Sequence, residues 1–107
     1  MGMTDNLEKM LAKGRDDAML RFGLGSAYFN DRAYDRAVPH LEACIAHDAD
    51  YSAAYKLLGR SLLKLGQTEQ AAAVFDQGLQ AARRQGDKQT EKEITVFRQR
   101  LTRESND

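Results

Sequence analysis

The stretch LGSAYFNDRAYDRAVPHLEACI, residues 24–45, decides the fold, because a related stretch follows it at a fixed distance. Residues 58–79 read LGRSLLKLGQTEQAAAVFDQGL, so the two stretches begin 34 residues apart. In both, a Leu-Gly pair is followed at the same offsets by an alanine and then by a large apolar residue. A period of this length is typical of stacked supersecondary units that bury their apolar faces against one another.

The apolar pattern within each unit predicts two amphipathic helices. In the first unit Leu20, Leu24, Ala27 and Tyr28 recur at i, i+4, i+7 and i+8, which places them on one helical face. We expect the glycine after Leu24 to let the partner helix approach closely. A larger apolar residue in the partner helix would then fill the space between the helix layers.

Turn and capping residues divide these units into helices. We expect breaks at residues 30–31 (Asn-Asp) and at residues 65–67 (Leu-Gly-Gln). Asp16 and Asp50 precede the first helix of each unit, and aspartate is a favoured N-cap residue. Pro39 falls early in its helix, where a missing backbone donor costs little.

The two ends continue the same phase with single helices. Residues 4–13 predict one helix that begins at a Thr4 or Asp5 cap and stops at Gly14. Its apolar stripe should cover the edge of the first unit, and consists of Met3, Leu7, Met10 and Leu11. At the other end, residues 86–87 (Gly-Asp) should end one helix and cap an amphipathic helix with a polar outer face. We expect fraying from Glu104 to Asp107.

These motifs resemble the tetratricopeptide repeat pattern of Leu-Gly-x-x-Tyr followed by Ala and Phe. The first copy supplies Leu24, Gly25, Tyr28, Ala37 and Leu41, and the second Tyr55, Leu58, Gly59, Leu62, Ala71 and Phe75. The resemblance implies an all-α, right-handed superhelix of helical hairpins with capping helices. The expected division is an N-terminal half-repeat (1–17), two repeats (18–51 and 52–85) and a C-terminal capping helix with its tail (86–107).

Composition narrows the class of function. Sixteen basic residues balance sixteen acidic ones, which argues against a dedicated nucleic-acid binder. Cys44 is the single cysteine, and neither a signal peptide nor a stretch of ~20 apolar residues is recognisable, so we expect a cytoplasmic protein. No nucleophile, carboxylate pair or phosphate loop is evident, so we expect no enzyme and no cofactor.

One cluster permits a metal-site hypothesis. His40, Cys44 and His47 fall at i, i+4 and i+7 of one predicted helix, a spacing that can present ligands to zinc. A structural zinc site normally takes four ligands, and the sequence offers no evident fourth. Cys44 also occupies a repeat position where the second copy has Gly78, so we expect a small buried packing residue and no metal.

The resemblance also implies a concave groove lined by the first helix of each pair. Carried onto this chain, the groove positions are Met19, Phe22, Ser26, Phe29 and Asn30, then Ala53, Lys56, Arg60, Leu63 and Lys64, and, on the capping helix, Lys88, Glu91, Thr95 and Arg98. The groove should therefore be apolar near its start and basic toward its end.

We expect this groove to bind a peptide or helix of another protein that carries an apolar anchor and acidic side chains. The residues expected to bind it are Met19, Phe22, Ser26, Phe29, Asn30, Lys56, Arg60, Leu63, Lys64 and Arg98. Co-chaperones of the family clamp a carboxyl terminus, but Phe22, Ser26 and Leu57 stand in the first three clamp positions. An alternative is a homodimer formed through the face of Met19, Phe22 and Phe29, or through a repeat edge.

Overall fold

All regular secondary structure in the described part of the chain is helical. The computed structural model describes the backbone of residues 2–106 and the side chains of residues 2–103. Six helices follow one another in this region: α1 (Met3–Ala12), α2 (Ala18–Asn30), α3 (Tyr34–His47), α4 (Ser52–Lys64), α5 (Thr68–Gln85) and α6 (Lys88–Asn106). The all-α prediction is confirmed, and the predicted breaks at residues 30–31 and 65–67 coincide with the ends of α2 and α4.

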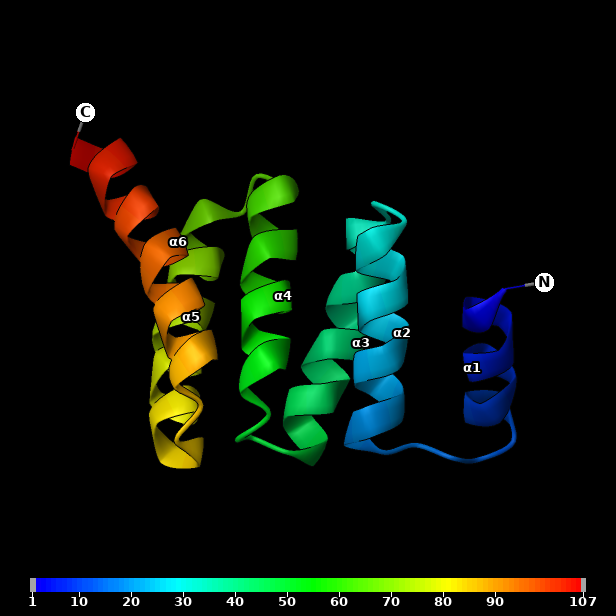
Figure 1. Cartoon of the computed structure of the whole chain (residues 1–107). Helices are drawn as coiled ribbons and strands as arrows, with labels where there is room; N and C mark the ends of the chain where they lie inside the picture. The colour runs from blue at the N-terminus through cyan, green and yellow to red at the C-terminus, as the bar shows by residue number, and fades with distance from the viewer. Residues whose placement is uncertain (1, 107) are drawn as a thin grey trace.

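The helices form an elongated stack of antiparallel hairpins. Helix α2 pairs with α3 and α4 pairs with α5, while α1 and α6 lie at opposite ends of the stack (Figure 1). The molecule measures 47 × 28 × 18 Å along its principal axes. In Figure 1, α2 lies in front of α3 and α6 in front of α5, and α4 contacts both α2 and α6.

Two helical glycines set the distance between the paired helices. A Cβ atom added at Gly25 would lie 2.5 Å from Cδ2 of Leu41, and one at Gly59 would collide with the ring of Phe75. Leu41 and Phe75 are both fully buried. Each large side chain therefore fills the space that its glycine leaves open, as the sequence pattern predicts.

Helices α2 and α6 begin at capping aspartates. The backbone N–H of Leu20 donates to Oδ1 of Asp17 at 2.7 Å, and that of Thr90 donates to Oδ1 of Asp87 at 3.1 Å. The hydroxyl of Ser52 also donates to Asp87, at 2.7 Å, which ties the start of α4 to the start of α6. Asp87 is thus the cap that the sequence predicts.

The predicted caps Asp16 and Asp50 are wrong. Asp16 lies one residue before the true cap of α2, and its carboxylate pairs with Arg21 and His47. Asp50 accepts from Arg84 of α5 at 2.6 Å, while Tyr51 occupies the N-cap position of α4 without a side-chain cap. Both aspartates therefore link neighbouring helices and cap neither of them.

The capping aspartates predict a loss of stability in acid. The hydrogen bond from the Leu20 N–H, followed by the bond from Arg15, lowers the pKa of Asp17. The hydrogen bonds from Thr90 and Ser52 lower the pKa of Asp87. A folded-state pKa below the unfolded value gives stability that is present above the unfolded pKa and is lost as the pH falls through the folded pKa. We therefore expect the urea midpoint to fall as the pH drops from about 5 to about 2.

Asp87→Asn is the matched variant for this titration. Asparagine still caps a helix but carries no carboxylate to protonate. The variant should show a smaller change of urea midpoint between neutral and acid pH than the wild type. A pH dependence equal to that of the wild type would show that Asp87 contributes nothing to it.

The terminal helices differ from their predictions in detail. Helix α1 begins at Met3 after an N-cap at Gly2, so neither Thr4 nor Asp5 is the cap. Leu7 and Leu11 are half-buried, but Met3 is 71% exposed and Met10 41%, so the predicted stripe covers the repeat edge only in part. The reason is that α1 packs mainly on α2 and has no paired helix of its own on its outer side.

At the other end, α6 extends through Asn106, so the backbone of residues 104–106, where we expect fraying, is helical. Leu101, which is 5% exposed, holds the C-terminal half of α6 against the core. Asp107 lies outside the described residues.

Candidate functional site

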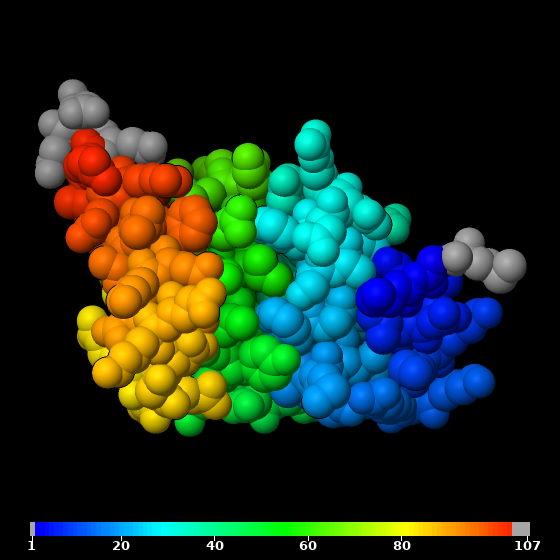
Figure 2. Space-filling view, in the orientation of Figure 1, coloured from blue at the N-terminus to red at the C-terminus, as the bar shows by residue number. Residues whose placement is uncertain are grey.

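The shared face of α2, α4 and α6 is the candidate site. Helix α4 contacts both α2 and α6. In Figure 2, α4 (green) lies between α2 (blue to cyan) and α6 (orange). Side chains from three helices that are far apart in sequence therefore meet on one surface, which we call the groove.

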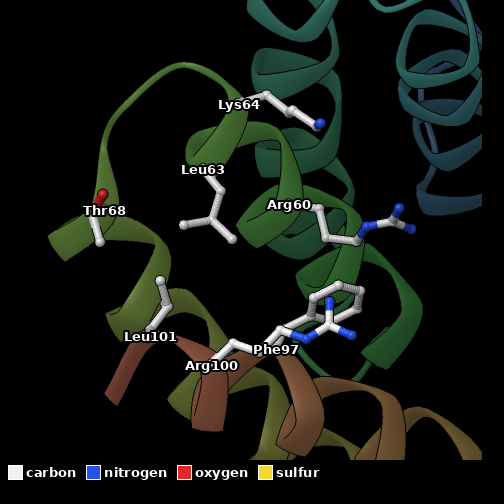
Figure 3. A pocket seen from close by; sticks show the side chains of 7 residues that line it. All are labelled: Arg60, Leu63, Lys64, Thr68, Phe97, Arg100 and Leu101. Atoms are coloured by element: carbon white, nitrogen blue, oxygen red, sulfur yellow. The ribbon is translucent and has the colours of Figure 1, made fainter. Parts of the chain in front are cut away.

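The C-terminal half of the groove contains a cleft between α4 and α6. Its volume is about 490 Å³. The residues that line it, shown in Figure 3, are Arg60, Leu63, Lys64, Thr68, Phe97, Arg100 and Leu101. Three of the predicted site residues, from α4, therefore lie together in one cleft. The remaining lining residues come from the start of α5 and the end of α6.

Arg60 is held between two aromatic rings. Its guanidinium carbon lies 4.8 Å from the centre of the Phe29 ring of α2 and 5.0 Å from the centre of the Phe97 ring of α6. Arg100 also lies over Phe97, at 5.7 Å. Arginine is attracted to aromatic faces at such distances, so the rings fix the position of the charge across the groove.

The cations of the cleft have no acidic partners. Among the side chains of residues 2–103, no carboxylate forms an ion pair with Arg60, Lys64 or Arg100. By contrast, Lys56 pairs with Glu93 at 3.2 Å. The cleft therefore combines an apolar wall with three uncompensated positive charges.

The N-terminal half of the groove is less open than the sequence suggests. Met19 is 70% exposed. Phe22 is half-buried because its ring packs on Tyr51 at 4.9 Å between centroids. Asn30 is exposed, and the hydroxyl of Ser26 is buried without a hydrogen-bond partner. Of the predicted apolar anchors in this half, only Met19 presents most of its side chain to solvent.

The capping helix presents a different face from the predicted one. Arg98 pairs with Asp76 of α5 at 3.0 Å, and Glu91 pairs with Arg83 of α5 at 2.8 Å. Neither side chain lines the cleft; Phe97 and Arg100 do. Two of the groove positions predicted for this helix therefore lie on the side that contacts α5. The buried residues of α6 are Thr90, Ile94 and Leu101.

The side chains behind the metal-site hypothesis contact separate partners. His40 contacts Arg21 at 3.1 Å and Glu8 at 3.4 Å, and His47 contacts Asp16 at 3.0 Å. Cys44 is fully buried, and burial raises the pKa of its thiol to about 12. A thiol with so high a pKa stays protonated at neutral pH, which is typical of a cysteine that packs in a core.

Stacked antiparallel helix pairs with a shared groove define a helical-repeat protein. The tetratricopeptide repeat family matches residues 31–88 of the chain. A TPR repeat-containing protein of Pseudomonas aeruginosa is 48% identical over 101 residues, which cover 94% of this chain and 96% of that protein. The solution structure of a Bordetella parapertussis protein is 43% identical, with a TM-score of 0.84, covering 97% of this chain and 90% of the other.

A tetratricopeptide repeat domain protein of Salinibacter ruber shares the fold, with a TM-score of 0.75 at 24% identity, over 80% of this chain and 96% of that one. The chain therefore belongs to the tetratricopeptide repeat family, as its motifs predict. Members of this family generally mediate protein–protein interaction and are typically not catalytic. No helix within residues 2–106 has both the length and the apolar character needed to cross a membrane.

Proposed function

We propose that the groove binds a segment of another protein that carries an apolar anchor and acidic side chains, and that the chain acts as an adaptor without catalysis. The observation that supports this most strongly is the cleft between α4 and α6, where Arg60, Lys64 and Arg100 surround apolar side chains and have no acidic partner among the side chains of residues 2–103. Cations left unpaired beside an apolar surface favour an amphipathic acidic ligand. A cytoplasmic location is part of the same proposal.

Rigidity supports the proposal energetically. The guanidinium of Arg60 already lies between two rings before any ligand binds, and the helices beneath it are fixed by buried core residues. Ordering a long side chain on binding costs about 0.5–1.5 kcal/mol. The groove avoids much of that cost at Arg60, so the partner segment carries most of the ordering.

Affinity capture with matched variants tests the proposal. The groove variant carries Arg60→Glu and Arg100→Glu. The control carries Lys9→Glu in α1 and Lys13→Glu at its C-cap, two exposed positions that make the same change of net charge. A protein retained by the wild type and the control, but lost by a groove variant with unchanged circular dichroism, is the expected result. Its binding to purified protein should weaken as salt rises, because exposed charge pairs are screened. Equal loss in both variants, or in neither, would exclude the groove.

Self-association is a second candidate, supported by the exposed methionines of α1. Met3 and Met10 lie at a repeat edge and are 71% and 41% exposed. In the face of Met19, Phe22 and Phe29, both rings instead pack within the chain, on Tyr51 and Tyr34. Sedimentation at increasing concentration decides between the candidates: a mass that doubles, and returns to that of a monomer in a Met3→Lys, Met10→Lys variant, would place the interface at α1.

A further inference from the structure

The cleft between α4 and α6 has two chemically different sides. In Figure 3 the side-chain nitrogens of Lys64, Arg60 and Arg100 point to one side of the cleft, while Leu63, Leu101 and Thr68 lie on the other. The cationic side is the one toward Phe29 of α2, whose ring contacts Arg60. A ligand that fills this cleft must therefore place an apolar group and an anionic group in a defined order.

The N–H groups of Arg60 remain available to a ligand. Rings from α2 and α6 lie 4.8 and 5.0 Å from its guanidinium carbon. Among the described side chains Arg60 forms no hydrogen bond or ion pair, so its N–H groups can still donate. A carboxylate matches the edge of the guanidinium, because its two oxygens accept two parallel N–H bonds.

We propose that this cleft binds two neighbouring side chains of an acidic partner segment: an apolar side chain between Leu63 and Leu101, and a side-chain carboxylate on the edge of Arg60. Lys64 and Arg100 add positive charge beside that carboxylate, and the volume of about 490 Å³ has room for both groups. Phe29 does not line the cleft, so it is a positioning residue that acts through Arg60. The proposal rests on the proposed function, whose ligand it specifies.

The probe is a short blocked peptide, acetyl-Glu-Leu-Glu-amide, titrated into isotope-labelled protein and followed by amide chemical shifts. The comparison peptide, acetyl-Gln-Leu-Gln-amide, keeps the shape and removes both carboxylates. We expect saturable shifts at Arg60, Leu63, Phe97 and Leu101, at millimolar peptide, with affinity at least about tenfold weaker for the glutamine peptide. Equal binding of both peptides, or no shift up to about 20 mM, would overturn the proposal.

Variants separate the roles of the residues. Arg60→Gln should weaken the probe about tenfold, and Arg60→Lys should fall between Arg60→Gln and the wild type, since lysine keeps the charge but loses the planar edge. Phe29→Leu should weaken it about threefold while thermal unfolding stays near that of the wild type, because leucine keeps the packing but not the aromatic face. Lys13→Gln, at the exposed C-cap of α1, is the matched control and should bind as the wild type does. Unchanged affinity in Arg60→Gln would contradict the assignment.

Two further outcomes distinguish this proposal from the proposed function. Shifts at Met19 and Phe22 instead of the cleft would overturn the assigned cleft but leave the groove as the binding surface. Shifts confined to the outer faces of α3 and α5 would overturn both.

A third peptide, acetyl-Gln-Leu with a free terminal carboxylate, tests whether the cleft recognises a side-chain carboxylate or a terminal one. If it binds more tightly than the glutamate probe, the cleft recognises a chain terminus, and the side-chain assignment is wrong.

Discussion

Replacing Gly59 by alanine should destabilise the protein in the wild-type background and stabilise it once Phe75 has been shortened. The added Cβ would collide with the ring of Phe75, which is fully buried and cannot move aside into solvent. Overpacking of this kind typically costs about 1–3 kcal/mol. Alanine is favoured over glycine in a helix by about 1 kcal/mol, so the net cost of Gly59→Ala should be about 0–2 kcal/mol in the free energy of unfolding, and toward the upper end because the buried ring cannot move aside.

Phe75→Ala alone should cost about 3–5 kcal/mol, because it removes a ring that the core fully encloses and leaves a cavity. The ring also stacks on Phe97 at 5.8 Å, so α6 should lose part of its support. In this shortened background the Cβ at position 59 meets no ring. The double variant should therefore be up to about 1 kcal/mol more stable than Phe75→Ala, the reverse of the wild-type effect.

Urea unfolding of the wild type, Gly59→Ala, Phe75→Ala and the double variant measures this double-mutant cycle, provided that the circular dichroism and fluorescence transitions coincide. The same cycle in the first repeat, with Gly25→Ala and Leu41→Ala, provides an independent test, because a Cβ at Gly25 would lie 2.5 Å from Leu41. If Gly59→Ala costs the same in both backgrounds, the glycine is not required by the approach of Phe75.

The repeat core could be predicted from the sequence because the same contact occurs twice. Gly25 with Leu41, and Gly59 with Phe75, obey one spacing, so each pair supports the other. The ends of α2 and α4 also follow from local turn residues. These features depend on neighbours in sequence or on the repeat period, both of which are visible in a single chain.

Of the residues that line the candidate site, the sequence predicts only those on α4. Arg60, Leu63 and Lys64 lie in the cleft, and they belong to a complete repeat. Phe97 and Arg100 were missed because the capping helix has no second helix to fix its phase in the sequence. The periodic spacing of Thr90, Ile94, Phe97 and Leu101 carries this information, because it marks the inward face of α6. The residues that line the cleft therefore lie at and beside Phe97 and Leu101, and not at Arg98.

The caps show a second limit of the sequence. Asp16 and Asp17 are adjacent, and both are good capping residues. Asp17 is the N-cap of α2, whereas the carboxylate of Asp16 contacts Arg21 and His47. His47 lies in α3, thirty-one residues further along the chain. Long-range partners of this kind leave no local pattern, so the capping residue is decided only in three dimensions.

Gly23→Leu should release helix α1 while the rest of the protein stays folded. A Cβ at Gly23 would lie 3.3 Å from Cδ1 of Leu7, so there is room for an alanine only after a small shift, and none for a leucine side chain. The second repeat has Leu57 at the equivalent position, where it packs on the core, so leucine is compatible with the helix itself. The conflict is therefore with α1 alone.

Release of α1 should be local because its attachment is weak. No residue of α1 is fully buried, and its polar links to α2 and α3 include a hydrogen bond from Tyr28 to Glu8 at 3.0 Å and a contact of His40 with Glu8 at 3.4 Å. Repeats of this architecture contact only their neighbours, and segments with few buried contacts open at low free energy. No residue of α1 belongs to the buried core cluster or packs directly against it.

Amide hydrogen exchange measures this directly. In Gly23→Leu we expect the amides of Met3–Ala12 to exchange at the rate of an unfolded peptide, while those around Leu58 and Phe75 keep nearly wild-type protection. Gly23→Ala is the matched control and should keep α1 protected, since the gain in helix propensity offsets the small crowding at Leu7. Protection of α1 that survives the leucine would mean that Leu7 can repack around it. Loss of protection throughout the chain would mean instead that α1 is an integral part of the cooperative core, and that an isolated half-repeat is enough to hold the stack together.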